Sequence, residues 1–344
     1  MSNQSERILI LAEGFSGDPH YGKTARGVMR YGADPVVAVV DSERPGESLD
    51  GVPVVATVED ALAYEPTTAL VGVATAGGRL PEKWRDILKS AVAAGLDLES
   101  GMHQFLGDDP ELAELARKHD AEIRDLRRAP ADLSVPTGEN LKHGATAILT
   151  VGSDCAIGKM SVSLELDRGA RERGLNSVFV PTGQTGIAIA GWGIAVDAVV
   201  ADFIAGAAER LVVEGAGRGD LLWVEGQGSL VHPDYSGVTL GLFHGSAPHF
   251  LVLCHQVGDE HIQDLPAHPI PSLPALVELH ERIALPVRPS KVIALALNTR
   301  RLDEEEAQAA IEAAEKETGL PADDPVRFGP GSLLDAILPR VSRV

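Results

Sequence analysis

Short apolar runs separated by amphipathic stretches fill the first part of the chain. The runs predict buried strands, because apolar residues occupy consecutive positions instead of alternate ones. We expect strands at 7–12, 35–41, 54–56, 69–74 and 96–99, and helices at 24–31, 81–94 and 110–119. Strands that are apolar throughout and alternate with helices indicate a parallel sheet covered on both faces. The first part of the chain therefore predicts a Rossmann-like domain.

The same alternation returns after a segment in which the apolar pattern stops. That segment, 127–143, contains Pro130, Pro136 and Gly138 and predicts a linker between two domains. Beyond it we expect strands at 147–151, 177–181, 221–225, 250–255 and 292–297, and helices at 159–174, 196–214, 274–282 and 303–318. The fold class predicted for the whole chain is α/β with mainly parallel sheets, in one domain at 1–135 and a second at 136–344.

The most informative local pattern follows the first strand of the second domain, where Gly152 and Gly158 bound a loop and Lys159 begins a helix. Such a loop turns backbone N–H groups inward at a helix N-terminus, and the lysine adds a positive charge, so the arrangement binds phosphate. The loop is one residue longer than a strict P-loop, and Met160 stands where a hydroxyl residue normally follows the lysine. We expect a P-loop NTPase-like domain with a solvent-facing lysine. Its predicted cofactor-binding residues are Gly152, Ser153, Asp154, Cys155, Ala156, Ile157, Gly158, Lys159, Met160 and Ser161.

A second lysine loop, at 17–24, fits the strict P-loop pattern better than the loop at Gly152 does. Its context is less favourable, because four residues separate it from the preceding strand and Pro19 removes one N–H donor. We interpret it as a surface loop of the first domain.

Polar residues follow three further strands of the second domain, and ligands of open α/β sheets bind beyond the carboxyl ends of the strands. Glu225 ends an apolar strand and is a candidate general base. Asp202, inside the expected helix at 196–214, is either a second candidate base or a solvated residue. The candidate substrate-binding residues are Thr182, Gly183, Gln184, Thr185 and Arg300.

Cysteine and histidine spacing predicts no metal site. The histidines from His232 to His268 follow no metal-binding spacing, and two cysteines, Cys155 and Cys254, exclude a disulfide framework and a cysteine-rich zinc site. Cys155 lies inside the phosphate loop, where it is either an acyl-carrying nucleophile or a small packing residue.

The charge balance limits the partners. Asp and Glu number 50 against 30 Lys and Arg, a formal net charge of -20, which argues against nucleic acid and anionic membranes as partners. Surplus acid with few lysines indicates either adaptation to high salt or an ordinary acidic cytosolic enzyme. The chain shows neither a secretory signal nor an apolar run of membrane-spanning length, so we expect a cytoplasmic protein.

The motifs resemble two known groups of proteins. The loop at 152–159 and the turn at 224–228 resemble dethiobiotin synthetase and its P-loop relatives. The wider layout resembles a two-domain family long labelled as of unknown function, whose assigned members are D-glutamate N-acetyltransferases of marine bacteria and halophilic archaea. The segments that carry this resemblance are 12–14, 22–25, 30–31, 183–186 and 196–200.

The family resemblance implies acetyl-CoA as co-substrate, D-glutamate as acceptor and D-amino acid catabolism, with a functional link to an N-acetyl-amino-acid racemase. We also expect a homo-oligomer. Acetyl transfer to an amine needs a base, donors for the oxyanion and cations for the substrate carboxylates. The alternative is an ATP-dependent ligase or carboxylase of the dethiobiotin synthetase type, with magnesium; the sequence leaves both hypotheses open.

Overall fold

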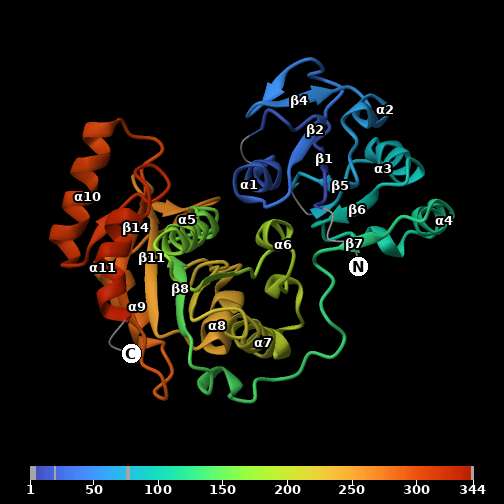
Figure 1. Ribbon diagram of the computed structural model, residues 1–344. Coiled ribbons are helices and arrows are strands. Elements are labelled where there is room, and N and C mark those ends of the chain that lie inside the picture. The colour runs from blue at the N-terminus through green and yellow to red at the C-terminus, as the bar shows by residue number, and fades with distance from the viewer. Residues whose placement is uncertain (1–4, 19–20, 75–77, 342–344) are drawn as a thin grey trace. The chain divides into compact units, whose positions relative to one another are not determined.

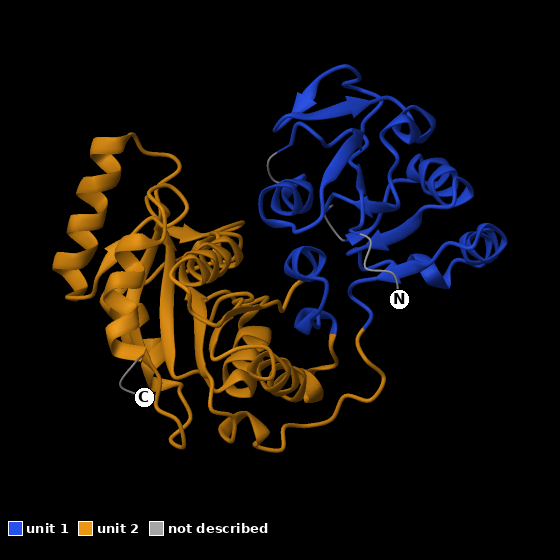
Figure 2. Ribbon diagram, in the orientation of Figure 1, with its two compact units in different colours: residues 1–128, 184–198 blue, residues 129–183, 199–344 orange. Residues whose placement is uncertain are grey.

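The computed structural model of the protein describes residues 5–18, 21–74 and 78–341. The chain divides into two compact units (Figure 2): unit 1 comprises 1–128 and 184–198, and unit 2 comprises 129–183 and 199–344. The chain therefore leaves unit 2 after Gly183, adds one segment to unit 1 and returns at Val199. The boundary predicted at 135 lies near the first passage, whereas nothing in the sequence pattern predicted the second.

Unit 1 is built on a seven-stranded sheet in the order β3-β4-β2-β1-β5-β6-β7 (Figure 1). Its pairings are parallel except for the short β3–β4 pair. Apart from the edge strand β3, this is the strand order of the Rossmann fold, which confirms the predicted Rossmann-like domain. The strands are β1 (Ile8–Leu11), β2 (Val36–Val40), β3 (Ser48–Leu49), β4 (Val52–Val55), β5 (Thr68–Val71), β6 (Asp97–Ser100) and β7 (Ile123–Asp125). The helices are α1 (Lys23–Tyr31), α2 (Val58–Ala61), α3 (Trp84–Ala93), α4 (Pro110–His119) and α6 (Gln184–Ala190).

Unit 2 contains a six-stranded parallel sheet in the order β15-β14-β11-β8-β10-β9. The strands are β8 (Thr146–Gly152), β9 (Ser177–Val180), β10 (Leu221–Val224), β11 (Phe250–Gln256), β14 (Lys291–Asn298) and β15 (Ala322–Asp323), with a separate hairpin of β12 (His261–Ile262) and β13 (Leu265–Pro269). The helices are α5 (Lys159–Glu172), α7 (Ile204–Ala216), α8 (Ser236–Ser246), α9 (Leu273–Arg282), α10 (Glu304–Thr318) and α11 (Gly331–Val341).

The core of unit 2 lies on both faces of this sheet. On one face, Trp223 and Ile148 are fully buried against Leu166 of α5 and Leu334 of α11. Alternate residues of the same strands point to the other face, which α7 and α8 cover (Figure 1). The parallel strands thereby bring their carboxyl ends to one edge, which is where the loop at 152–159 lies.

Capping residues in the sequence define several helix starts. Asp109 accepts the N–H groups of Glu111 and Leu112 before α4, with Pro110 at the first helical position. Asp303 and Glu306 form a reciprocal capping box at the start of α10. These side chains satisfy N–H groups that have no partner inside the helix, so both helices begin where the sequence predicted.

The single helix expected at 196–214 is wrong in its first part. Two 3₁₀ turns, Val196–Ala198 and Ala201–Phe203, precede α7, which begins only at Ile204. Asp197 lies in the first turn and forms an ion pair with Arg127 of unit 1, so the segment is fixed by tertiary contacts and not by helix propensity. Asp202 lies in the second turn and is exposed.

Other elements were absent from the prediction, because they lack a clear period. The sequence of α8 contains three glycines and no Asp, Glu, Lys or Arg, and the seven-residue α6 is apolar after its first two residues, so neither shows a charged face opposite an apolar one. Among the described residues, no helix is both long enough and apolar enough to cross a bilayer.

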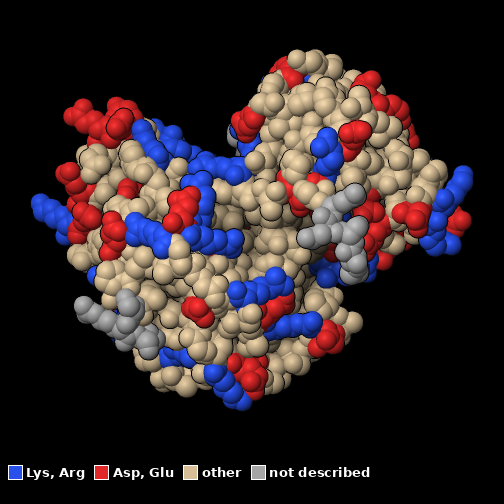
Figure 3. All heavy atoms as spheres, viewed as in Figure 1, with Lys and Arg blue, Asp and Glu red and all other residues tan. Residues whose placement is uncertain are grey.

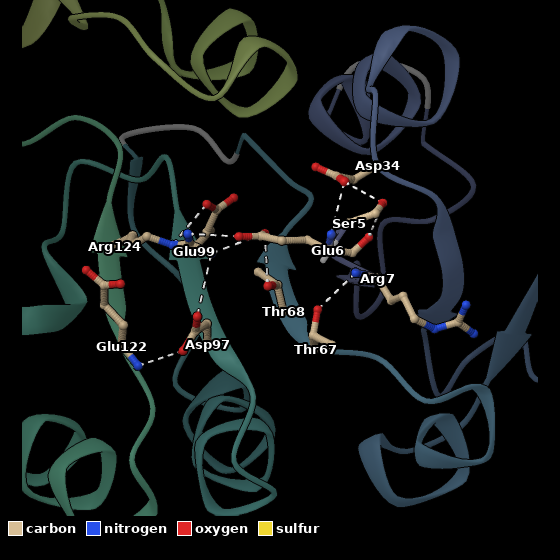
Figure 4. A network of polar contacts seen from close by, with 10 residues as sticks. All are labelled: Ser5, Glu6, Arg7, Asp34, Thr67, Thr68, Asp97, Glu99, Glu122 and Arg124. Carbon is tan, nitrogen blue, oxygen red and sulfur yellow. Dashed lines mark hydrogen bonds and ion pairs between the residues drawn. The ribbon is translucent and has the colours of Figure 1, made fainter. Parts of the chain in front are cut away.

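One arginine in unit 1 serves several carboxylates at the amino edge of the sheet (Figure 4). The Arg124 guanidinium contacts Glu6 at 3.0 Å and Glu99 at 3.1 Å, and Asp97 lies at 3.9 Å. Burial raises the pKa of Glu99, and the charge of Arg124 partly offsets this effect. The arginine therefore lowers the cost of ionising a carboxylate that is largely removed from solvent.

We expect Arg124→Met to destabilise the protein by about 2 kcal/mol at neutral pH, because Glu6 and Glu99 lose their counter-ion. The pKa of Glu99 in the folded state lies above its unfolded value, so its ionisation costs stability as pH rises, and without Arg124 this cost grows. The loss measured by urea unfolding should therefore be smaller at about pH 5 than at about pH 8. Equal losses at both pH values would contradict the electrostatic explanation. Arg117→Met, which breaks an exposed pair with Glu114, is the matched control.

His249 should make unit 2 sensitive to acid. Burial, with the charge of Arg288 and the neighbouring His143, lowers the pKa of His249 from 6.5 to about 4. A depressed folded-state pKa contributes stability that is complete above the unfolded value and is lost as pH falls from about 6.5 toward 4, by up to about 3 kcal/mol. His249→Asn retains an acceptor for the Ala147 N–H, so its unfolding free energy should fall less over that range. If the variant keeps the full acid slope in urea titrations, His249 is not responsible.

Candidate functional site

The loop between β8 and α5 is shaped by two residues in the left-handed region. Gly158, immediately before α5, has a φ of 110°, and Ala156 has a φ of 53°. A side chain at 158 would be strained, so the backbone requires the glycine of the sequence motif. The turn sets the loop at the N-terminus of a 14-residue helix. The first N–H groups of a helix have no intrahelical partner and attract anions.

Neighbouring segments of unit 2 hold this loop in shape. The side-chain amide of Asn298, at the end of β14, donates to the carbonyl of Ile157 at 3.0 Å. The hydroxyl of Ser229, in the loop after β10, donates to the carbonyl of Gly152 at 2.9 Å. Side chains from outside the loop thereby bind two of its carbonyl oxygens, and these contacts hold the loop in shape without a ligand.

Lys159 is buried, with 6% of its surface exposed, and does not face solvent as the sequence suggested. Its Nζ donates to the carbonyl oxygen of Asp154, across the loop, at 2.6 Å. Burial lowers the pKa of Lys159, an effect that the nearby Cys155 and Asp154 partly offset. A desolvated ammonium of this kind gains more from an anion than an exposed lysine would.

Glu225 follows β10 directly and is buried. Its Oε2 accepts the backbone N–H groups of Thr182 at 2.8 Å and of Gly183 at 3.0 Å. The hydroxyl of Thr182 donates in turn to the backbone carbonyl of Glu225 at 2.7 Å. The carboxylate therefore fixes the end of β9 against the end of β10.

The residue after Glu225 brings the two loops together. A Cβ added to Gly226 would overlap the carbonyl oxygen of Thr150 and would lie 2.9 Å from the stem of Lys159. The Gly226 N–H donates to the Thr150 hydroxyl at 2.9 Å. Only glycine permits this approach, which places Glu225 beside the lysine of the phosphate loop.

A cluster of three potential metal ligands joins the phosphate loop to the segment between β10 and α8, although the sequence spacing did not predict it. One ligand atom each of Asp154, Cys155 and His232 lie within 4.8 Å of one another. The Asp154 carboxylate already accepts two backbone N–H groups. One belongs to Cys155, and the other belongs to Gln263 in the β12–β13 turn, at a distance of 2.7 Å. Nδ1 of His232 accepts a backbone N–H from Asp234 at 3.2 Å, which places the proton of the neutral ring on Nε2. These contacts favour a role in holding the loop, and we assign no metal to it.

Comparison with protein families decides the classification. The family described as "Domain of unknown function (DUF1611_C) P-loop domain" matches residues 134–334. Its companion, "Domain of unknown function (DUF1611_N) Rossmann-like domain", matches residues 42–129. The chain belongs to the DUF1611 family. The predicted pairing of a Rossmann-like domain with a P-loop domain is confirmed.

Relatives of this DUF1611 protein carry a functional name. A D-glutamate N-acetyltransferase of Tritonibacter scottomollicae is 38% identical over 339 residues, which cover 96% of this chain and 98% of the relative. One of a Pseudoalteromonas species is 37% identical over 270 residues, covering 78% and 80%. The crystal structure of a DUF1611 family protein from Anabaena variabilis ATCC 29413 is 42% identical and has a TM-score of 0.92, covering 97% of this chain and all of that one.

The residues predicted to bind substrate in this DUF1611 protein are divided between the two units. Thr182 and Gly183 are bound to Glu225 in unit 2, whereas Gln184 begins α6, which belongs to unit 1. The Thr185 hydroxyl contacts that of Thr24 at 2.9 Å, also in unit 1. Arg300 is exposed at the carboxyl end of β14, at the same sheet edge as the phosphate loop.

The second lysine loop of the DUF1611 protein is described only in part, since Pro19 and His20 lie outside the described residues. Lys23 begins α1 and is exposed, and Gly22 precedes it with a φ of -81°. This loop thus lacks the left-handed glycine that turns the loop at Gly158 into the start of α5.

Proposed function

We propose that the protein is an N-acetyltransferase that moves the acetyl group of acetyl-CoA to the amino group of D-glutamate. The observation that carries the proposal is the 38% identity with a D-glutamate N-acetyltransferase along 96% of the chain. Similarity that spans both units includes the loops at the edge of each sheet, where function resides in α/β proteins.

The loop after β8 supports coenzyme A as the cofactor. Coenzyme A carries a pyrophosphate, and a buried lysine at a helix N-terminus suits that group. Met160 occupies the position of the usual magnesium-binding hydroxyl, which a CoA site does not need. In an ATP-dependent enzyme of the dethiobiotin synthetase type, the carboxylate at the end of this strand would help to place magnesium. Two backbone N–H groups engage Oε2 of Glu225, which disfavours that role.

The length of coenzyme A bears on the role of Glu225. The pantetheine arm separates the pyrophosphate from the thioester by on the order of 15 Å when extended. Glu225 lies beside Lys159, at the phosphate end of such a cofactor. We therefore propose Glu225 as a positioning residue of the cofactor loop, instead of the general base that the sequence suggested.

The reaction itself is attack by a neutral amine on the thioester carbonyl, after which the C–S bond breaks and CoA leaves as the thiol. A base must remove the amine proton, and N–H donors must stabilise the oxyanion. Asp202 stays the candidate base, because it is an exposed carboxylate on a short turn that a substrate can reach. We further propose that the enzyme is cytoplasmic and homo-oligomeric and that it works at high salt. It would act in D-amino acid catabolism, in the same breakdown route as a racemase of N-acetyl-amino acids.

The proposal is tested with the purified protein in high salt, acetyl-CoA and a panel of D- and L-amino acids. Release of free thiol should require D-glutamate and should be independent of magnesium and ATP. A flat thiol signal with every amino acid would remove the assignment. Magnesium-dependent ATP binding without CoA binding in a calorimetric titration would instead favour the ligase or carboxylase.

A further inference from the structure

The loop after β14 carries an arginine, Arg300, whose charge no residue in the described part of the chain neutralises. Arg300 is exposed, and within residues 5–18, 21–74 and 78–341 its guanidinium has no hydrogen-bond or ion-pair partner. Its neighbour Arg301, in contrast, forms an ion pair with Asp259. The chain has a formal net charge of -20, so its overall field repels anions. An unpaired cation near an anion-binding loop attracts anions locally and opposes that repulsion.

The position of Arg300 follows from its neighbours in the chain. Asn298, two residues earlier, contacts the phosphate loop through the Ile157 carbonyl, and its Oδ1 accepts the Arg300 N–H at 3.3 Å. The side-chain amide of Asn298 thus links the Ile157 carbonyl to the Arg300 backbone N–H, so the backbone of Arg300 lies one amide group away from the phosphate loop. On this face of unit 2, basic side chains gather between α10 and α5 (Figure 3).

The backbone that carries Arg300 is held rigidly. The buried carboxylate of Asp324 accepts both the N–H and the hydroxyl of Thr299 at 2.8 Å. The guanidinium of Arg327 donates to the carbonyls of Thr299 at 3.2 Å and of Leu302 at 3.0 Å. The loop from 299 to 302 is therefore fixed at both ends, and Arg300 is presented on a preorganised support.

We propose that Arg300 binds the 3′-phosphate of coenzyme A while the loop at 152–159 binds its pyrophosphate. The proposal rests on the proposed function. A phosphomonoester carries a charge of about -1.5 to -2 at pH 7, and a guanidinium can bind it through two parallel hydrogen bonds. ATP and ADP lack this group, so the arginine selects coenzyme A over the common adenine nucleotides.

This role differs from the carboxylate-binding role that the sequence suggested for Arg300. The amino-acid substrate meets the thioester, on the order of 15 Å from the pyrophosphate, whereas the 3′-phosphate lies on the ribose next to the pyrophosphate. Three glutamates in the first turn of α10, Glu304 to Glu306, oppose an anion nearby. We therefore expect a moderate contribution of about tenfold in affinity, at the lower end for a charge-assisted contact.

The experiment compares the binding of CoA and of dephospho-CoA by isothermal titration. The wild type should bind CoA about tenfold more tightly, and Arg300→Ala should bind the two ligands equally. Arg300→Lys, which keeps the charge but loses the bidentate geometry, should fall between them. Arg218→Ala is the matched control, since it removes an exposed arginine before β10, at the opposite edge of the sheet.

Equal binding of CoA and dephospho-CoA by the wild type would overturn the inference, as would an Arg300→Ala variant that still prefers CoA. Either result leaves the proposed function intact if D-glutamate-dependent thiol release persists. Failure of the wild type to bind either ligand, together with no thiol release, would remove both the inference and the proposed function.

Discussion

Lys159→Met should weaken the binding of acetyl-CoA about ten- to a hundredfold. The variant loses one charge-assisted contact with phosphate, worth about 1.5–3 kcal/mol. Methionine is preferred to alanine because the lysine stem is buried and packs against the Gly226 turn, so that alanine would leave a cavity. Isothermal titration measures the change in affinity, and urea unfolding reports whether the fold is retained.

The pH dependence offers a second readout of the same lysine. Burial lowers the pKa of Lys159, and phosphate needs the ammonium form. Wild-type affinity should therefore fall as pH rises through this lowered pKa, and the affinity of Lys159→Met should not follow that change. Lys23→Met, at the start of α1, is the control and should bind acetyl-CoA like the wild type. Unchanged affinity in Lys159→Met beside a loss in Lys23→Met would move the phosphate site to the second lysine loop, at 17–24.

Glu225→Gln should raise the KM for acetyl-CoA about tenfold or more. The carboxylate accepts two backbone N–H groups and thereby fixes the Thr182–Gly183 segment. A hydrogen bond to a charged group contributes about 1.5–3 kcal/mol to stability, and the neutral amide of glutamine weakens both bonds. A positioning residue changes KM and leaves the pH profile of kcat intact. A general base would instead lower kcat by about 10²–10⁴-fold and remove the acidic limb of the profile.

Glu209→Gln is a matched control for Glu225→Gln. Glu209 on α7 is also buried and accepts the N–H groups of Thr137 at 2.6 Å and Gly138 at 2.7 Å. Its substitution should lower stability by a similar amount and leave the KM for acetyl-CoA unchanged. Equal rises of KM in both variants would mean that Glu225 acts only through the stability of unit 2.

Much of the fold could be predicted because its strands are apolar throughout and its helices carry caps. Asp109 and Asp303 begin α4 and α10 where the sequence indicates. The segment 184–198 could not be placed in unit 1, because that placement depends on contacts such as the Arg127–Asp197 ion pair, between residues far apart in sequence. Because of such contacts, the first part of the helix expected at 196–214 forms two short turns instead.

The candidate site was partly predictable for a similar reason. The loop at 152–159 shows a local pattern of glycines and lysine, and its backbone geometry follows that pattern at Gly158. The burial of Lys159 and the engagement of Glu225 by Thr182 and Gly183 depend on how β9, β10 and α5 meet, and no local spacing encodes this. The cluster of Asp154, Cys155 and His232 likewise joins positions that are distant in sequence.

The most direct test of the proposed activity is chiral chromatography with mass spectrometry of the product formed from D-glutamate and acetyl-CoA labelled in its acetyl group. The label should appear in N-acetyl-D-glutamate, in amounts equal to the CoA released, with L-glutamate giving little product. Release of CoA with the label in free acetate, or no labelled amino acid from either enantiomer, would contradict the assignment of this protein as a D-glutamate N-acetyltransferase.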